Sequence, residues 1–171
     1  MDARLDRIKA AFNALDTDAN GYLEADDFDR LAHRITHALD VPESSAKAQA
    51  LRTGCRRYWQ GLVGALDQNN DGKLTYEEYA RFHEPAGYEV NVRPYAEALT
   101  GICDRDDDGF VQHADFVRGM RAVGFPEENV EALFQAFDPH GTGRVAVGEW
   151  RTAIEEYFLA RGGHAVGDTL V

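Results

Sequence analysis

Cysteine and methionine are scarce in this chain of 171 residues, which contains two of each. Two cysteines cannot form the disulfide framework of a small secreted domain, so we expect a reducing compartment. The sequence has no apolar run long enough to span a bilayer, and residues 1–12 are amphipathic without the apolar core of a signal peptide. Residue 2 is aspartate, which excludes N-myristoylation. These absences predict a soluble cytoplasmic protein without a membrane anchor.

Patterns typical of catalysis and of nucleic-acid binding are also missing from the sequence. We find no nucleophile motif, no phosphate-binding glycine loop and no basic patch interleaved with aromatic residues. The formal net charge of −12 would also repel nucleic acid and anionic membranes. We therefore expect neither an enzyme nor a nucleic-acid-binding protein.

Segment 67–78 carries oxygen-bearing side chains at positions 1, 3, 5, 9 and 12 of a twelve-residue loop. This is the ligand spacing of an EF-hand calcium loop, because Ca²⁺ takes six to eight oxygen ligands. Gly72 stands at position 6, where the chain turns sharply with a positive φ, and Leu74 at position 8 is placed to pair with another loop. The candidate ligands are Asp67, Asn69, Asp71, the backbone carbonyl of Lys73 and both carboxylate oxygens of Glu78.

The same register recurs in segments 16–27, 104–115 and 138–149. Every copy begins with an aspartate, has glycine at position 6 and has an aliphatic residue at position 8. The four segments hold 16 of the 30 acidic residues but only three of the 18 basic ones, so the remaining chain is nearly neutral. An acidic surface that is merely solvated would have spread these acids along the helices instead. The concentration favours divalent cation sites.

The first and third segments present nearly complete ligand sets that end in aspartate. Asp is one methylene shorter than Glu and reaches the ion with both oxygens only if the loop contracts. Since Mg²⁺ prefers six close ligands, we predict mixed Ca²⁺/Mg²⁺ binding at these two sites. The candidates are Asp16, Asp18, Asn20, the Tyr22 carbonyl, Glu24 and Asp27 in the first, and Asp104, Asp106, Asp108, the Phe110 carbonyl, Gln112 and Asp115 in the third.

The fourth segment has lost most of its ligands. Asp138 and Glu149 remain, but positions 3, 5 and 9 are His140, Thr142 and Ala146. A nitrogen donor suits calcium poorly. Two interpretations stay open: a weak ion site, or a loop kept to pair with the third through its position 8. We expect three Ca²⁺ sites.

Helical apolar periodicity flanks each loop, which predicts an all-α protein with four hands. Hands must pair to bury their apolar faces, so we expect a compact structure with two lobes, one with two and three with four, and short antiparallel bridges between paired loops. The expected division is residues 1–83, a linker over 84–91, residues 92–160 and a tail over 161–171. We predict a helix opened by Pro42, a cap at Asn91, and a helix end at Gly124 before a start at Pro126. The tail is frayed, or Val166, Leu170 and Val171 fold back into an apolar groove.

Four hands, a long first connection and aspartate at position 12 in hands one and three together resemble the sarcoplasmic calcium-binding proteins and calexcitin, and most closely their bacterial relatives of the calerythrin type. The resemblance covers the whole chain and implies a compact, two-lobed calcium buffer. In calerythrin-like proteins the second hand is typically the degenerate one, whereas here the second loop is intact and the fourth is eroded. The number of sites therefore cannot be transferred from the family.

Calcium ions are the expected partners of a monomer, and two roles are consistent with the motifs. The first is an intracellular Ca²⁺ buffer. The second is a sensor that exposes an apolar groove to an unknown protein partner. Adaptable grooves tend to be rich in methionine, and this chain has only Met1 and Met120, which favours the buffer. A third hypothesis, a ligand binder of the calcium-triggered photoprotein kind, needs a large apolar cavity.

Overall fold

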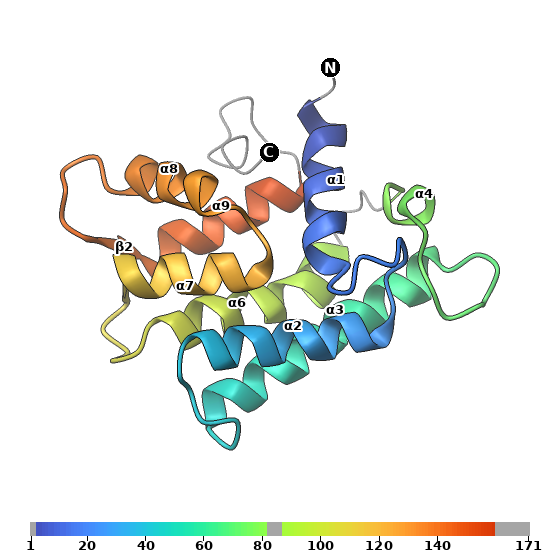
Figure 1. Ribbon diagram of the computed structural model, residues 1–171, viewed down its shortest axis with the longest axis horizontal. Coiled ribbons are helices and arrows are strands. Elements are labelled where there is room, and N and C mark those ends of the chain that lie inside the picture. The colour runs from blue at the N-terminus through green and yellow to red at the C-terminus, as the bar shows by residue number, and fades with distance from the viewer. Residues whose placement is uncertain (1–2, 82–86, 160–171) are drawn as a thin grey trace.

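The computed structural model describes residues 3–81 and 87–159 of the chain (Figure 1). Helices account for most of this part, and two short strands complete it, as the periodicity predicted. The elements in order are α1 (Ala3–Leu15), α2 (Ala25–Ala38), α3 (Ala46–Leu66), α4 (Tyr76–Tyr79), the π-helix η1 (Tyr88–Val92), α6 (Arg93–Cys103), β1 (Phe110–Gln112), α7 (His113–Val123), α8 (Glu127–Phe137), β2 (Arg144–Ala146) and α9 (Val147–Leu159).

The helices form a single apolar core from the residues that recur at three- and four-residue spacing. Burying these side chains removes apolar surface from water, at about 25 cal/mol per Å². The core therefore supplies the driving force that holds the acidic loops in place. Its fully buried large side chains include Phe28, Leu31, Ile35, Tyr58, Leu62, Phe116 and Trp150.

Paired loops meet at position 8, as expected. Leu23 and Leu74 form an isolated antiparallel bridge in which each backbone N–H donates to the other's carbonyl at 2.9 Å. In the other pair β1 and β2 form a two-stranded antiparallel sheet with Val111 opposite Val145. All four aliphatic side chains at position 8 are buried. The pairing of hands one with two and three with four is thus confirmed.

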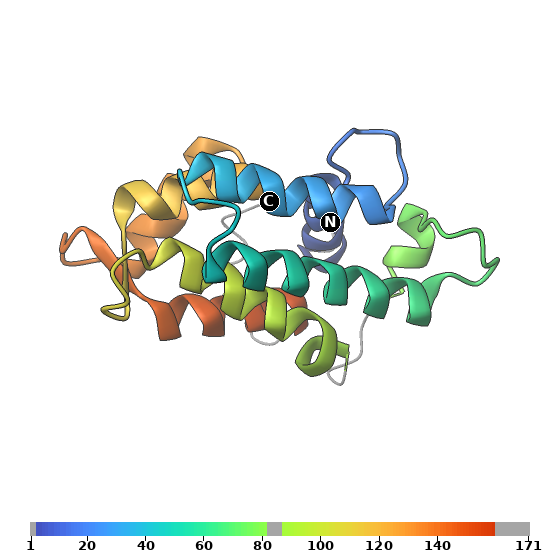
Figure 2. The same ribbon diagram turned by 90° about the horizontal axis from the view of Figure 1, so that it is seen from below.

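The two pairs of hands pack directly against each other along α3 and α6, which lie side by side (Figure 2). The contact is close because a glycine lies in it. A Cβ added at Gly54 of α3 would come within 2.9 Å of the Tyr95 Cα of α6, closer than real Cβ atoms approach another carbon. Helix α2 also packs on α7. The contact between lobes is therefore part of the core.

Three helix boundaries test the expected turn chemistry. Gly124 ends α7 with a φ of 124°, and Pro126 stands at the N-cap before α8, both as predicted. The prediction for Pro42 was wrong, because α3 starts only at Ala46, where the Ser45 side chain accepts a hydrogen bond from the Ala48 N–H at 3.2 Å.

Asn91 was wrongly predicted as a cap. It lies inside η1, which runs straight into α6, and its side chain faces Gly61 of α3. Residues 84–86 of the expected linker and the tail with Val166, Leu170 and Val171 lie outside the described residues. Within the described chain, the helices are all too short or too polar to cross a bilayer.

Candidate metal centres

All four loops are built on the same internal frame. In each, the carboxylate at position 1 accepts hydrogen bonds from the backbone N–H groups at positions 5 and 6. These bonds fold the loop around the position-1 oxygens. The pairs are Asn20 and Gly21 to Asp16 (3.1 and 2.9 Å), Asp71 and Gly72 to Asp67 (3.3 and 3.0 Å), Asp108 and Gly109 to Asp104 (3.2 and 3.0 Å), and Thr142 and Gly143 to Asp138 (2.7 Å each).

The glycine at position 6 has a positive φ in every loop, as predicted for Gly72, where it is 76°. A Cβ would meet nothing within 4 Å at this position, so the glycine is needed for its backbone conformation. Position 4 also has a positive φ, at Ala19, Asn70, Asp107 and Gly141. Each loop therefore contains two residues in the left-handed region.

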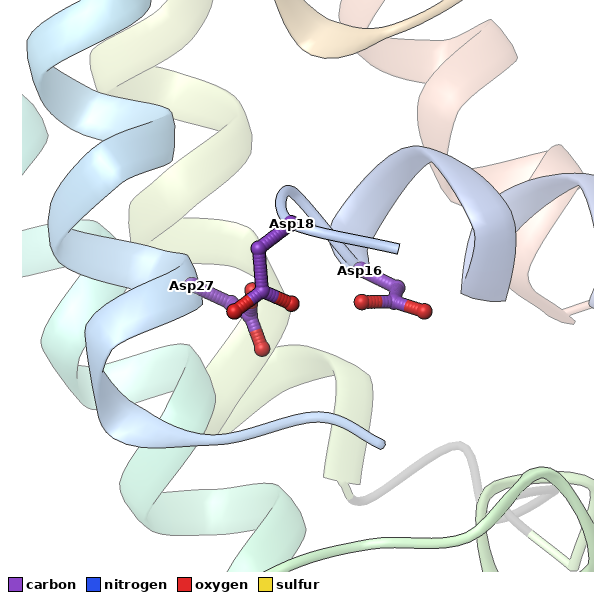
Figure 3. Close-up of side chains that lie close together, drawn as sticks. All are labelled: Asp16, Asp18 and Asp27. Carbon is purple, nitrogen blue, oxygen red and sulfur yellow. The ribbon is translucent and has the colours of Figure 1, made fainter. Parts of the chain in front are cut away.

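In the first loop the structure brings three of the predicted ligands together. Carboxylate oxygens of Asp16, Asp18 and Asp27 lie within 4.8 Å of one another (Figure 3). Asp27 comes from the first turn of α2 and is fully buried, whereas Asp18 is exposed. Asn20 at position 5 accepts a hydrogen bond from the Tyr22 N–H at 2.9 Å. The cluster has the composition of a site for a divalent cation.

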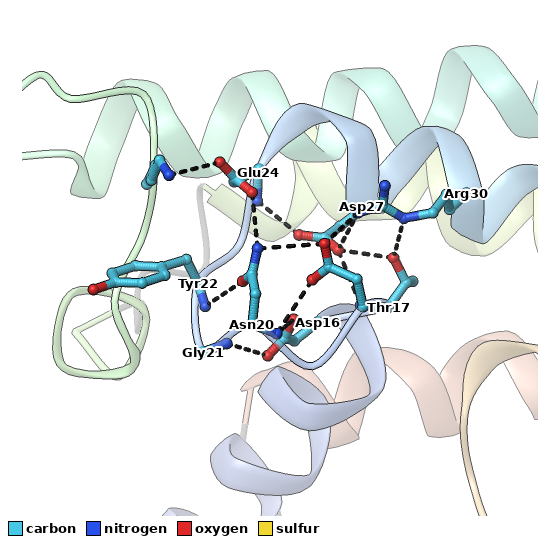
Figure 4. A network of polar contacts seen from close by, with 10 residues as sticks. Asp16, Thr17, Asn20, Gly21, Tyr22, Glu24, Asp27 and Arg30 are labelled. Atoms are coloured by element: carbon cyan, nitrogen blue, oxygen red, sulfur yellow. Dashed lines mark hydrogen bonds and ion pairs between the residues drawn. The ribbon is translucent and has the colours of Figure 1, made fainter.

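Sequence reasoning missed two residues of this site, Thr17 and Arg30. The Thr17 N–H and hydroxyl donate to Asp27 Oδ1 at 3.0 and 2.7 Å, and Arg30 Nη2 donates to the same oxygen at 3.1 Å (Figure 4). Arg30 also reaches Asp18 Oδ2 at 3.1 Å and the Thr17 hydroxyl at 2.9 Å. The hydrogen bond to Asp27 raises the pKa of Arg30 above its ordinary value. A guanidinium therefore already holds two of the three clustered carboxylates.

The second loop is closed by Glu78. This side chain is 9% exposed, and its Oε2 accepts from the Thr75 N–H at 3.0 Å while Oε1 faces the Gln68 N–H at 3.4 Å. Asn69 accepts from the Asp71 N–H at 3.1 Å, and Asp71 from the Lys73 N–H at 2.9 Å. In the described chain, only the first and third loops gather three acids within 4.8 Å; the second offers an amide at position 3.

The third loop gathers Asp104, Asp106 and Asp108 within 4.8 Å of one another. Asp108 accepts from the Phe110 N–H at 2.8 Å. Asp115, the expected closing ligand, is outside this cluster and lies 3.6 Å from the guanidinium of Arg105. The position-12 side chain therefore joins the carboxylate cluster in the first loop, where it is Asp27, and faces the Arg105 guanidinium in the third, where it is Asp115.

Lys47 approaches the third loop from the start of α3. Its Nζ donates to the backbone carbonyl of Asp104 and lies 2.8 Å from Asp107 Oδ1. This contact joins residues 57 positions apart in the chain. The third loop is thus held by an element of the other lobe.

The fourth loop satisfies its own carboxylate internally. The Thr142 hydroxyl donates to Asp138 Oδ1 at 2.7 Å, and this bond, followed by the Gly143 N–H, lowers the pKa of Asp138. Glu149 at position 12 is exposed. The fourth loop has kept the hydrogen-bonded frame, but the Thr142 hydroxyl at position 5 donates its proton to the Asp138 carboxylate at position 1.

Position 7 links the loops within each pair through side chains. Lys73 Nζ lies 3.1 Å from Glu24 and 5.5 Å from the centre of the Tyr22 ring. In the other pair Arg144 stacks 3.9 Å from the centre of the Phe110 ring. The hydrogen bond from Lys73 lowers the pKa of Glu24. Position 7 was predicted to offer its backbone carbonyl as a ligand, and its side chain adds a cation–aromatic contact in both pairs.

An apolar cavity of about 70 Å³ lies between the lobes, lined by Tyr58, Tyr95, Met120, Trp150 and Tyr157 among others. For comparison, an engineered cavity that binds benzene has a volume of about 150 Å³. This cavity is too small to enclose a multi-ring aromatic ligand. The size counts against the photoprotein-like hypothesis.

Comparison with known proteins identifies relatives of this architecture. A family model described as an EF-hand domain pair matches residues 5–83. Calerythrin from Saccharopolyspora erythraea is 27% identical over 163 residues, which cover 91% of this chain and 92% of calerythrin. A Streptomyces coelicolor calcium-binding protein, whose structure was solved to explain prokaryotic calcium-mediated regulation, is 33% identical with a TM-score of 0.79 and covers 93% of this chain and 99% of its own. A sarcoplasmic calcium-binding protein from amphioxus shares the fold at 20% identity and a TM-score of 0.70, over 99% of this chain and 96% of that one.

Proposed function

We propose, since this chain belongs to the EF-hand calcium-binding proteins related to calerythrin and to the sarcoplasmic calcium-binding proteins, that it acts as a cytoplasmic calcium buffer. The observation that carries this proposal is the clustering of carboxylates on rigid loop frames whose flanking helices pack into one shared core. A buffer needs sites that take up ions without a large rearrangement. A core shared by both lobes resists such a rearrangement.

Three of the loops would hold ions. We assign Asp16, Asp18, Asn20, the Tyr22 carbonyl and Asp27 to the first, Asp67, Asn69, Asp71, the Lys73 carbonyl and Glu78 to the second, and Asp104, Asp106, Asp108, the Phe110 carbonyl and Asp115 to the third. The second would select Ca²⁺ most strongly, because Glu78 can bind with two oxygens. The first and third would also accept Mg²⁺. The fourth would serve as the structural partner of the third.

The cytoplasmic location and the monomeric state are parts of the same proposal. Cys55 and Cys103 are free thiols buried in the core, and burial raises the pKa of both. Such thiols are stable in a reducing compartment. The lobes would correspond to residues 1–83 and 92–160, joined through 84–91, and their mutual packing supports a self-contained monomer.

A calcium sensor is the second candidate, favoured by one observation. The relative that is 33% identical over most of its length was studied for calcium-mediated regulation. A sensor must expose apolar surface when calcium binds. In this chain that would require α3 and α6 to separate, or the apolar lining between the lobes to open.

Calorimetry and an apolar fluorescent dye together separate the two roles. Titration with Ca²⁺, with and without millimolar Mg²⁺, gives the number of sites and their selectivity, and we expect three. Dye fluorescence in Ca²⁺ should match that in Mg²⁺ alone if the protein is a buffer. A large calcium-specific rise would establish the sensor instead.

A further inference from the structure

Three of the four hands have an arginine three residues after the loop. These are Arg30, Arg81 and Arg118, whereas the eroded fourth hand has Thr152 at the equivalent position. Of these three described arginines, only Arg30 contacts carboxylates of its own loop, at 3.1 Å from both Asp18 and Asp27. Arg81 instead donates to the Gln68 amide oxygen at 2.6 Å, and Arg118 is exposed. The arginine of the first hand is therefore placed to affect ion binding directly.

Asp27 has few lone pairs left for an ion. Each carboxylate oxygen offers about two acceptor sites. Oδ1 already faces three donors: the Thr17 N–H, the Thr17 hydroxyl and Arg30 Nη2. Oδ2 accepts one bond, from the Glu24 N–H at 2.9 Å. An ion can therefore reach Oδ2, but it can reach Oδ1 only by displacing its donors.

We infer that Arg30 is a positioning residue that sets the choice between Ca²⁺ and Mg²⁺ at the first site, by holding Asp27 as a one-oxygen ligand. This inference rests on the proposed ion binding by the first loop. A one-oxygen ligand at position 12 favours six-fold coordination, which Mg²⁺ demands and Ca²⁺ merely tolerates. The positive charge of Arg30 also lowers the affinity of the site for any cation.

The two effects of Arg30 differ in their signatures. Removing its charge should strengthen the binding of both ions. Removing the side chain also takes Nη2 away from Oδ1 and releases the Thr17 hydroxyl, which accepts from Arg30 Nε at 2.9 Å. Of the three donors only the Thr17 N–H is then held in place, and the acceptor site that opens on Oδ1 should strengthen only Ca²⁺, which can use a second oxygen. A change in the Ca²⁺/Mg²⁺ selectivity therefore reports how Asp27 is held, and an equal change in both affinities reports the charge of Arg30. Because the Arg30 side chain is 42% exposed, its replacement leaves the core intact.

The test measures both affinities in the full-length Arg30→Gln variant. The Gly21 N–H donates to Asp16 at 2.9 Å, so its resonance in nitrogen–proton correlation spectra reports on the first loop directly. We expect Ca²⁺ to bind about tenfold more tightly and Mg²⁺ about threefold more tightly. The preference for Ca²⁺ over Mg²⁺ should then rise about threefold.

Arg118→Gln provides the matched control. It makes the same charge change at the equivalent position of the other hand that ends in aspartate, without a carboxylate contact, and the Gly109 resonance should report unchanged selectivity there. Arg30→Lys should restore most of the original Ca²⁺/Mg²⁺ ratio, since an ammonium can still donate to Asp27 Oδ1.

The possible results separate this inference from the proposed function. Unchanged selectivity in Arg30→Gln, or an equal loss of affinity for both ions, would overturn the role of Arg30. Calcium binding at the first site would still stand. A Gly21 resonance that responds to neither ion in the unaltered protein would overturn the first site itself, and this inference with it.

Discussion

The C-terminal pair of loops has fewer ligands than the N-terminal pair, but it has more backbone pairing between its two loops. The first pair, with two well-supplied loops, is joined by the single bridge between Leu23 and Leu74. The second pair contains the eroded fourth loop, yet its strands Phe110–Gln112 and Arg144–Ala146, of three residues each, form a two-stranded sheet. Backbone pairing therefore does not follow the number of ligands. The fourth loop has lost its oxygens and kept its role as a partner.

The hydrogen bonds within the loops explain how a loop can keep its backbone pairing after it has lost its metal ligands. Asp138 holds the two amides of its frame at 2.7 Å, no longer than the equivalent bonds of Asp16 or Asp67. The frame needs one carboxylate and two residues with a positive φ, and it places no demand on the side chains at positions 3, 5, 9 or 12. A loop can thus lose metal binding without losing its fold.

Removing all ions should have the largest effect on both pairs. With an ion hundredfold above its dissociation constant, each site contributes about 2.7 kcal/mol to the free energy of unfolding. Three sites would raise the melting temperature by about 15–30 °C, given about 2–4 °C per kcal/mol for a chain of this size. Thermal melts in excess Ca²⁺ and in chelator measure this difference. A melting temperature indifferent to chelator would contradict the proposed sites.

Leu74→Ala should weaken the first pair by removing the buried side chain at its bridge. Leu74 is fully buried, so its truncation should cost about 2–5 kcal/mol in the free energy of unfolding. Val145→Ala at the equivalent position of the second pair removes less volume and leaves the sheet, so its cost should be smaller. Denaturant unfolding gives both values, with the exposed Glu77→Ala as control. Equal losses at the two positions would show that the pairs are equally robust.

Glu78→Gln should remove most of the affinity of the second loop. The substitution takes away a charge and weakens the two-oxygen grip, for which we expect a loss on the order of a hundredfold, about 2.7 kcal/mol. The neighbouring exposed Glu77→Gln makes the same charge change outside the ligand set. Calorimetry that finds the same affinity and stoichiometry in Glu78→Gln as in the unaltered protein would remove the second loop from the assignment.

Restoring the fourth loop should have the smallest effect. His140→Asp together with Thr142→Asp supplies the missing oxygens, and an aspartate at position 5 can accept from position 7, as Asp108 does from the Phe110 N–H at 2.8 Å. We expect the variant to bind one additional Ca²⁺ ion, because the affinity of the fourth loop for Ca²⁺ should rise about tenfold. The gain is limited by Ala146 at position 9 and by the exposure of Glu149. The reciprocal Asp106→His with Asp108→Thr should remove the third site. If stoichiometry stays the same in both variants, positions 3 and 5 do not explain the difference between the loops.

Much of the fold and of each loop could be predicted because it depends on local chemistry. The spacing of Asp67, Gly72 and Leu74 specifies a carboxylate that collects two amides, a residue with a positive φ and a buried pairing position, all within twelve residues. Helical periodicity around the loops likewise identified the buried faces. These features need only neighbours in the chain.

The contacts that modify the sites depend on how helices approach one another. Arg30 reaches Asp27 and Asp18 from three and twelve positions along the chain, whereas Lys47 reaches Asp104 across 57 positions. The sequence by itself determined the four loop frames, their pairing and the calcium chemistry. Tertiary structure alone decided that Lys47 reaches the third loop and how the lobes join, because these contacts form between residues that only the packing of distant helices brings within reach.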